Sequence, residues 1–162
     1  MIKKRQKKNQ FTKISDLPVI ILAGGKGSRL NKYTNKIPKP LIKIKNKVLI
    51  DIIIEQYQKY GVRKIIVAAG YKFELLKKHF KNKKNVQVVN TGLNSLTGLR
   101  IKKLQKFVST DNFFLTYGDG ISNINIKKLY QFHLNHKKIG TLSGVRPPSR
   151  FGVLNIKNNV LK

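Results

Sequence analysis

Val19-Ile-Ile-Leu-Ala-Gly-Gly-Lys-Gly-Ser-Arg-Leu30 joins an apolar run to a loop that holds three glycines and two cationic side chains. The run at residues 19–22 predicts a buried strand. Glycine backbone N–H groups can approach an anion because no Cβ stands in the way, and Lys26 and Arg29 add positive charge. The stretch therefore predicts a phosphate-binding loop at the end of a strand, with a nucleotide as the expected ligand.

Two common phosphate-binding patterns are absent from this loop. No Lys-Ser or Lys-Thr pair follows a glycine at the P-loop spacing, and Gly25-Lys-Gly27 lacks the third glycine of the dinucleotide-binding fingerprint. Judged on its glycines alone, an ordinary glycine-rich turn between a strand and a helix is the weaker alternative for this loop.

The composition indicates one domain. A chain of 162 residues can bury a real core, and the sequence has no internal repeat and no apolar stretch of membrane-spanning length. We expect a basic, disordered arm at residues 1–16 and one folded domain at 17–162. The first ten residues are charged and lack the apolar region of a secretory signal, and cysteine is absent, so the cytoplasm is the simplest location.

The net charge is strongly positive, at +29, with only six acidic residues. Such a charge commonly points to nucleic acid or to an acidic membrane surface. However, Lys, Ile and Asn all have A/T-rich codons and together dominate this chain, and its lysines are dispersed rather than interleaved with aromatic residues. We therefore expect no membrane binding and no specific nucleic-acid binding, with any weak polyanion binding confined to the N-terminal arm.

Hydrophobic periodicity predicts alternating strands and helices. The expected strands are residues 19–22, 64–69, 86–89, 112–117, 140–145 and 153–156, and the expected helices are 48–60, 73–80, 95–107 and 126–137. In the third helix we expect Leu96, Leu99, Leu104 and Phe107 to face the core. This order predicts an α/β fold with a largely parallel sheet, whose ligands bind beyond the carboxyl ends of the strands at a switch point. An exposed final strand would favour self-association into a homo-oligomer.

Two further segments carry polar groups at predicted strand ends. In Phe114-Leu-Thr-Tyr-Gly-Asp-Gly120, Asp119 lies where it could bind the Mg²⁺ that screens a nucleoside triphosphate, although a turn capped by Asp119 is the simpler alternative. In Thr91-Gly-Leu-Asn-Ser-Leu-Thr-Gly-Leu-Arg100, hydroxyl, amide and guanidinium donors could bind a base or phosphate, with a helix N-cap at Ser95 as the alternative. His79, His133 and His136 lack convincing metal-ligand spacing and are expected to be packed or solvated.

The segment Leu22-Ala-Gly-Gly-Lys-Gly-Ser-Arg-Leu30, followed by Pro38-Lys-Pro-Leu41, resembles the N-terminal signature of the sugar-1-phosphate nucleotidyltransferases. Residues 91–100, 116–120 and 146–156 resemble the glucose-1-phosphate cytidylyltransferase branch. The resemblance runs from Val19 to about Ile156 and covers the N-terminal portion of a usual member. It implies a Rossmann-like α/β fold of the nucleotide-diphospho-sugar transferase type, with a mostly parallel sheet and helices on both faces.

This resemblance also implies a reaction and a set of site residues. The sugar 1-phosphate, glucose 1-phosphate in this branch, would attack the α-phosphorus of CTP, giving a CDP-sugar and pyrophosphate. Arg29, Lys39 and Asp119 would be the catalytic residues, with Asp119 binding Mg²⁺. The nucleotide would be bound by Leu22, Ala23, Gly24, Gly25, Lys26, Gly27, Ser28, Arg29, Lys39, Ser95, Arg100 and Gly118.

The sequence departs from the branch pattern at several places. Leu99 replaces the second glycine of a Thr-Gly-Gly-Arg motif. Only residues 81–85 separate the predicted helix at 73–80 from the predicted strand at 86–89, whereas the branch usually has a longer segment before its Thr-Gly motif. UTP, dTTP or GTP therefore stay open as alternatives to CTP. The sequence also ends at Lys162, before the Glu-Lys-Pro sugar-phosphate segment and the second metal-binding Asp of the family, so a truncated, catalytically weak nucleotide-binding or regulatory fragment is a further alternative.

Overall fold

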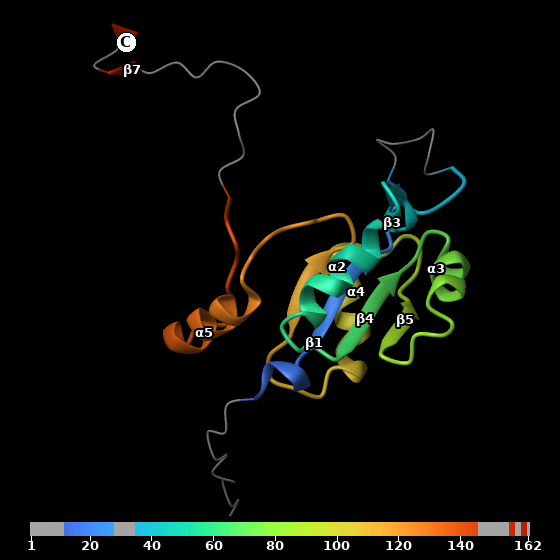
Figure 1. The fold of residues 1–162 in the computed structure, drawn as a ribbon, viewed down its shortest axis with the longest axis horizontal. Coiled ribbons are helices and arrows are strands. Elements are labelled where there is room, and N and C mark those ends of the chain that lie inside the picture. Colours follow the sequence, from blue (N-terminus) through green and yellow to red (C-terminus); the bar gives the residue numbers. More distant parts are fainter. Residues whose placement is uncertain (1–11, 28–34, 146–155, 158–159, 162) are drawn as a thin grey trace, which may run out of the picture.

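The computed structural model describes residues 12–27, 35–145, 156–157 and 160–161. Its centre is a four-stranded parallel sheet (Figure 1) with the spatial order β5-β4-β1-β6. The strands are β1 (Pro18–Ala23), β4 (Lys64–Ala69), β5 (Val86–Asn90) and β6 (Phe114–Tyr117). The chain adds β4 and β5 on one side of β1 and then crosses to add β6 on the other. This reversal creates a switch point between β1 and β6, where the connections leave in opposite directions and a ligand can enter.

Helices cover both faces of this sheet (Figure 1). Alternate residues of the buried strands point to opposite faces, so Val19 and Ile21 belong to one core cluster while Ile20 and Leu22 belong to another. Three helices pack on the first face and the fourth, which continues into a 3-10 turn, on the second. They are α2 (Leu49–Gln58), α3 (Phe73–His79) and α5 (Ile126–His136), then α4 (Thr97–Leu104) with η4 (Gln105–Phe107).

The remaining elements are short. They are η1 (Ile14–Asp16), η3 (Lys39–Leu41), the hairpin of β2 (Lys43–Ile44) with β3 (Lys47–Val48), and the hairpin of β7 (Ile156–Lys157) with β8 (Val160–Leu161). Ile14 packs against the main core, and the Tyr130 hydroxyl donates to the Thr12 carbonyl oxygen at 2.8 Å. Packing contacts thus begin inside the predicted N-terminal arm, of which residues 1–11 lie outside the described part.

The structure confirms the predicted α/β fold class with helices on both faces of a parallel sheet. Four strand predictions and four helix predictions fall on observed elements. Gly61 follows the end of α2 at φ +89°, a backbone conformation that favours glycine. Asn125 caps α5, because its side chain accepts a hydrogen bond from the Lys128 N–H at 3.0 Å.

The predicted helix at 95–107 needs correction at its start and at its buried face. The helix begins at Thr97, Leu96 occupies the N-cap position, and the Ser95 hydroxyl donates to the Thr91 carbonyl oxygen instead of capping. Leu104 is buried and Phe107 packs against the second core cluster, but Leu96 is 81% exposed and Leu99 is 48% exposed. Arg100 is the buried residue instead, because its guanidinium donates hydrogen bonds to the Thr91 hydroxyl oxygen and the Gly92 carbonyl oxygen at the carboxyl ends of the strands.

The predicted strand at residues 140–145 is wrong, since the structure places no strand there and the segment has no ladder partner among the described residues. A strand needs neighbouring backbone groups to pair with, and here Thr141 is held against α5 instead. Its Oγ1 lies 2.8 Å from His133 Nδ1 and 2.6 Å from His136 Nε2. Of the strand predicted at 153–156, Ile156 begins β7, and the other positions lie outside the described residues.

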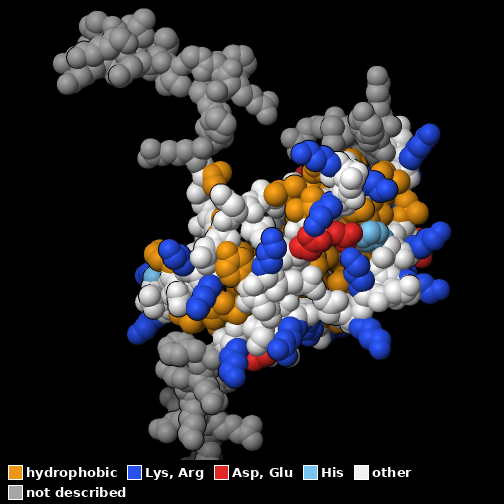
Figure 2. Space-filling model, in the orientation of Figure 1, with side chains coloured by type: hydrophobic (Ala, Val, Ile, Leu, Met, Phe, Trp, Pro, Cys, Tyr) orange, Lys and Arg blue, Asp and Glu red, His pale blue; other side chains and the backbone are white. Residues whose placement is uncertain are grey.

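Across the part of the chain that the structure describes, no helix has the length and apolar character needed to cross a bilayer. Lys and Arg side chains are spread singly over the face shown in Figure 2 and do not form a continuous stripe.

Candidate active site

An open pocket of about 300 Å³ lies at the carboxyl ends of β1 and β6, which is the switch point of the sheet. This is where ligands bind in open α/β sheets, and the volume is at the lower end of the range for ligand sites. The pocket brings together ten residues that the sequence predicted for the site. They are Leu22, Ala23, Gly24, Gly25, Gly27, Lys39, Ser95, Arg100, Gly118 and Asp119.

Three of the predicted residues are not placed in this pocket. Lys26 is exposed and does not contribute to the lining formed by the described residues. Ser28 and Arg29 lie outside the described residues. The part of the glycine loop that the structure does describe, residues 24–27, leaves β1 directly into the pocket wall.

Lys39 and Asp119 form an ion pair inside the pocket, although 80 residues separate them. The Lys39 Nζ lies 2.5 Å from Asp119 Oδ2, and the two side chains are 31% and 37% exposed. Lys39 begins η3 immediately after Pro38, and Asp119 follows β6 by two residues. A cation and a carboxylate are thus held side by side, where one could contact a phosphate and the other a divalent metal.

Backbone contacts fix Asp119 relative to the glycine loop. The Gly118 N–H donates to the Leu22 carbonyl oxygen at 2.9 Å, which extends the β1–β6 pairing to the pocket edge. A Cβ at Gly118 would lie 3.0 Å from Pro40 Cγ and 3.1 Å from the Leu22 oxygen, so glycine suits this close approach. Asp119 therefore projects from a backbone held by both neighbouring segments.

The metal-binding capacity of the pocket rests on one carboxylate. Within the described residues, Asp119 is the only acidic side chain that lines it, and no group of three or more His, Cys, Asp or Glu residues is placed to hold a metal. Mg²⁺ commonly takes one or two protein carboxylates and completes its shell with phosphate oxygens and water. A partly exposed carboxylate in an open pocket fits that donor set, so Mg²⁺ is compatible with this pocket.

Arg100 forms the floor of the pocket between three loops. It is 6% exposed, and its guanidinium donates to five oxygens, none of them from a carboxylate. Burial lowers the pKa of Arg100, but a guanidinium remains charged at neutral pH. The acceptors are the carbonyl oxygens of Gly24, Ala69, Gly92 and Leu93 and the hydroxyl oxygen of Thr91.

The loop after β5 is held by internal hydrogen bonds. The Thr91 carbonyl oxygen accepts from Ser95 Oγ at 2.5 Å and from Lys103 Nζ at 2.8 Å. Lys103 also donates to Ser95 Oγ at 3.0 Å. Ser95 thus lines the pocket while its own hydroxyl proton is used within the loop.

Sequence reasoning missed four residues of the pocket lining. They are Pro40, Leu96, Thr97 and Tyr117. Tyr117 could have been found, because it is the last residue of a predicted strand and directly precedes Gly118. Leu96 was assigned to the core from its apolar character, and only the position of Arg100 explains why it lies at the pocket instead.

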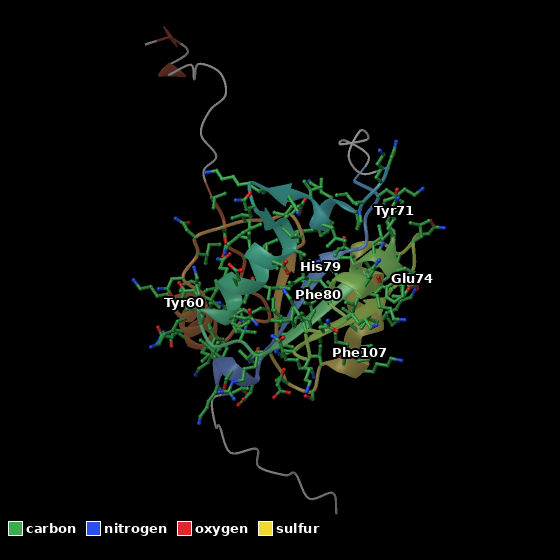
Figure 3. The ribbon with its side chains drawn as sticks, turned by 45° about the vertical axis from the view of Figure 1, so that its right-hand side comes forward. Tyr60, Tyr71, Glu74, His79, Phe80 and Phe107 are labelled. Atoms are coloured by element: carbon green, nitrogen blue, oxygen red, sulfur yellow. The ribbon has the colours of Figure 1, made fainter. Side chains whose placement is uncertain are left out.

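The three histidines make contacts away from the pocket. His79 Nε2 lies 3.0 Å from Asp51 Oδ2, and its ring meets that of Phe80 edge-on at 4.6 Å (Figure 3). Lys83 Nζ lies 2.9 Å from the other oxygen of Asp51. His133 and His136 both contact Thr141, as described above. These contacts are those of packed side chains.

The fold and the pocket define the class of this protein: an α/β domain whose ligand site lies at the switch point of a parallel sheet. Comparison with known families then gives the family. The model of the nucleotidyl transferase family matches residues 18–161, and the chain belongs to that family.

Curated relatives and solved structures are consistent with this assignment. The chain is 35% identical to a glucose-1-phosphate cytidylyltransferase of Salmonella typhimurium, over 87% of this chain and 65% of the relative. It is 33% identical to a D-glycero-alpha-D-manno-heptose 1-phosphate guanylyltransferase of Campylobacter jejuni, over 86% of this chain and 63% of the relative. The crystal structure of HddC from Yersinia pseudotuberculosis complexed with GMP-PN has a TM-score of 0.64 at 28% identity, over 74% of this chain and 55% of that one. The chain thus spans less than two thirds of the length of these relatives.

Proposed function

We propose that this protein is a sugar-1-phosphate nucleotidyltransferase that joins CTP to glucose 1-phosphate, releasing pyrophosphate. One observation carries the proposal: the pocket at the switch point places the glycine loop beside the Lys39–Asp119 pair. The choice of CTP and glucose 1-phosphate is supported by the 35% identity to a glucose-1-phosphate cytidylyltransferase.

The reaction is a displacement at phosphorus. A phosphate oxygen of the sugar 1-phosphate bonds to the α-phosphorus of CTP, and the bond from that phosphorus to the bridging oxygen of pyrophosphate breaks. Such a displacement needs positioning and charge stabilisation more than a side-chain nucleophile. The residues of this pocket are suited to those two tasks.

Each part of the pocket has a role in this proposal. The backbone N–H groups of residues 24–27 face the nucleotide, and Lys39 neutralises charge that develops on the phosphate oxygens. Asp119 would hold Mg²⁺, which when bound screens the triphosphate charge. The Lys39 ammonium has three N–H donors and is partly exposed, so it would donate to a phosphate oxygen while Asp119 holds the metal.

A second candidate is the same reaction with GTP and a different sugar 1-phosphate. It is favoured by the similarity to HddC in its complex with GMP-PN and by the 33% identity to a heptose 1-phosphate guanylyltransferase.

The test is pyrophosphate release from glucose 1-phosphate with CTP, UTP, dTTP or GTP, together with nucleotide binding. We expect release with CTP, and loss of release in Asp119→Asn. Glu55→Gln is the matched control, because it breaks an exposed ion pair with Lys47 (2.7 Å) outside the pocket and should leave release unchanged. Nucleotide binding without release would mean a nucleotide-binding domain without turnover, and no binding would overturn the proposal.

A further inference from the structure

Among the residues that the structure describes, Arg100 is the only buried cation, and its guanidinium is bonded to neutral oxygens. Its five acceptors come from three different segments that follow three adjacent parallel strands. Gly24 follows β1, Ala69 ends β4, and residues 91–93 follow β5. One side chain therefore connects the carboxyl ends of β1, β4 and β5 at the pocket floor.

The backbone around Arg100 is arranged to accept its guanidinium. A Cβ at Gly24 would collide with Arg100 Nη1 and Cζ, and a Cβ at Gly70 would lie 2.6 Å from Nη1 and 2.7 Å from the Gly92 oxygen. Gly70 does not line the pocket, so ligand approach does not explain its lack of a side chain. At both positions the guanidinium occupies the space that a side chain would need, and at Gly70 the backbone oxygens of Gly92 and Gly24 exclude a side chain as well.

Thr91 completes this arrangement. It is 1% exposed, and its Oγ1 donates to the Ala69 carbonyl oxygen at 2.6 Å and itself accepts from Arg100 Nη1 at 2.6 Å. The Thr91 N–H also donates to the Ala69 oxygen, at 2.8 Å, and the Tyr71 N–H donates to the Gly24 oxygen at 3.1 Å. Each loop is thus bonded both to its neighbour and to Arg100.

The position of α4 explains how Arg100 reaches all three loops. Figure 3 places Tyr71 and Phe107 at opposite ends of the sheet, and the helix runs between these ends. Arg100 lies in the first turn, near the carboxyl ends of the strands, while Leu104 one turn later is fully buried against the sheet. The helix is anchored by Leu104 and directs the guanidinium beneath the pocket.

We propose that Arg100 is a positioning residue of the nucleotide pocket, which fixes the glycine loop and residues 91–93 through their backbone oxygens and does not itself bind a phosphate. This inference rests on the proposed function. It assigns to Arg100 a task different from the direct nucleotide contact that the sequence resemblance implies. The planar guanidinium of Arg100 suits this role because its N–H donors point in several fixed directions. A lysine ammonium is a point charge and cannot span the same acceptors.

The experiment compares Arg100→Lys with Thr91→Val, using cytidine and CTP as separate probes. Lysine keeps the charge and removes the fork, while valine removes one acceptor and leaves Arg100 in place. Lys102→Gln is the matched control, because it removes a cation from an exposed position of the same helix. We expect Arg100→Lys to lower the binding affinity for cytidine and for CTP by the same factor. The factor should be about ten-fold, as for the loss of a hydrogen bond to a charged group. A smaller but equal weakening of both probes is expected in Thr91→Val.

A weakening confined to CTP would show that Arg100 binds phosphate and would overturn the proposal, as would unchanged affinity for both probes. Amide hydrogen exchange without nucleotide gives a second measurement. The Tyr71 and Thr91 amides should exchange faster in Arg100→Lys than in Lys102→Gln, and equal exchange would count against the proposal. If the unmodified chain binds neither probe, the proposed function fails, and the exchange data alone decide whether Arg100 holds these loops.

Discussion

Replacing Asp119 with asparagine should change the effect of Mg²⁺ on CTP binding. In the free protein the Asp119 carboxylate lies beside Lys39, at 2.5 Å, in the wall of the pocket. Without metal, this carboxylate repels a triphosphate and occupies the cation that would bind it. We therefore expect Asp119→Asn to bind CTP more tightly than the unmodified protein when Mg²⁺ is absent, and to gain little when Mg²⁺ is added.

The size of the effect follows from Coulomb's law. Two unit charges 4 Å apart in a water-like medium interact by about 1 kcal/mol, which corresponds to about five-fold in affinity. Because both side chains are about one third exposed, the medium is closer to water than to a protein interior. For the same reason, loss of the ion pair should cost less than about 1 kcal/mol of folding free energy, or a few degrees in melting temperature.

The assay is calorimetric titration of CTP with and without Mg²⁺, combined with thermal unfolding. Glu55→Gln is the control, because it removes a carboxylate from the Lys47 pair (2.7 Å), which lies outside the pocket. It should leave both CTP affinities unchanged. A weaker affinity of Asp119→Asn for CTP in the absence of Mg²⁺ would refute the reasoning, because Asp119 would then not face the phosphates.

Three further predictions concern stability. Gly24→Ala should destabilise the fold by about 1–3 kcal/mol in urea unfolding, because its Cβ overlaps a buried guanidinium, whereas Gly25→Ala, with open space around its Cβ, should be far milder. Ile53→Ala should cost about 2–5 kcal/mol in the same assay, while Leu99→Ala, at 48% exposure, should stay within about 0.5 kcal/mol. Burial raises the pKa of Tyr57, so the unfolded chain releases this proton first and stability should fall above about pH 10; Tyr57→Phe should reduce that fall in urea titrations at pH 9 to 11.

The sequence predicted the sheet and helices where the signal was local. The strands at β1 and β4 are continuous apolar runs, as expected for strands buried on both faces, and the helix at α2 has apolar residues at helical spacing. The parallel order then implies that loops after β1 and β6 share one edge of the sheet. Gly24, Gly118 and Asp119 line the pocket at that edge, as the rule predicts, whereas the full set of ten lining residues was implied by the resemblance to the sugar-1-phosphate nucleotidyltransferases.

The sequence could not predict which side chains turn inward in α4. Leu99 and Arg100 are adjacent, and hydrophobicity favours burial of the leucine. The arginine is buried instead because five oxygens converge on it from three loops, an arrangement that exists only once the sheet has formed. The ion pair between Lys39 and Asp119 could not be predicted from the sequence either, because the two residues are 80 positions apart and come together only when β1 pairs with β6.

The side chains of this pocket fall into two groups: Lys39 and Asp119 face the opening, and Arg100 is buried at the floor. Lys39 and Asp119 are partly exposed and paired, so they can exchange partners when a substrate arrives. Arg100 is buried and bonded to backbone oxygens, so it cannot leave its place without releasing three loops at once. In the displacement at phosphorus that we propose, positioning matters as much as charge, so the fixed guanidinium and the exchangeable pair would meet different needs of the same reaction. Loss of the pair should therefore change how metal and nucleotide bind, whereas loss of the guanidinium should change how well any nucleoside fits.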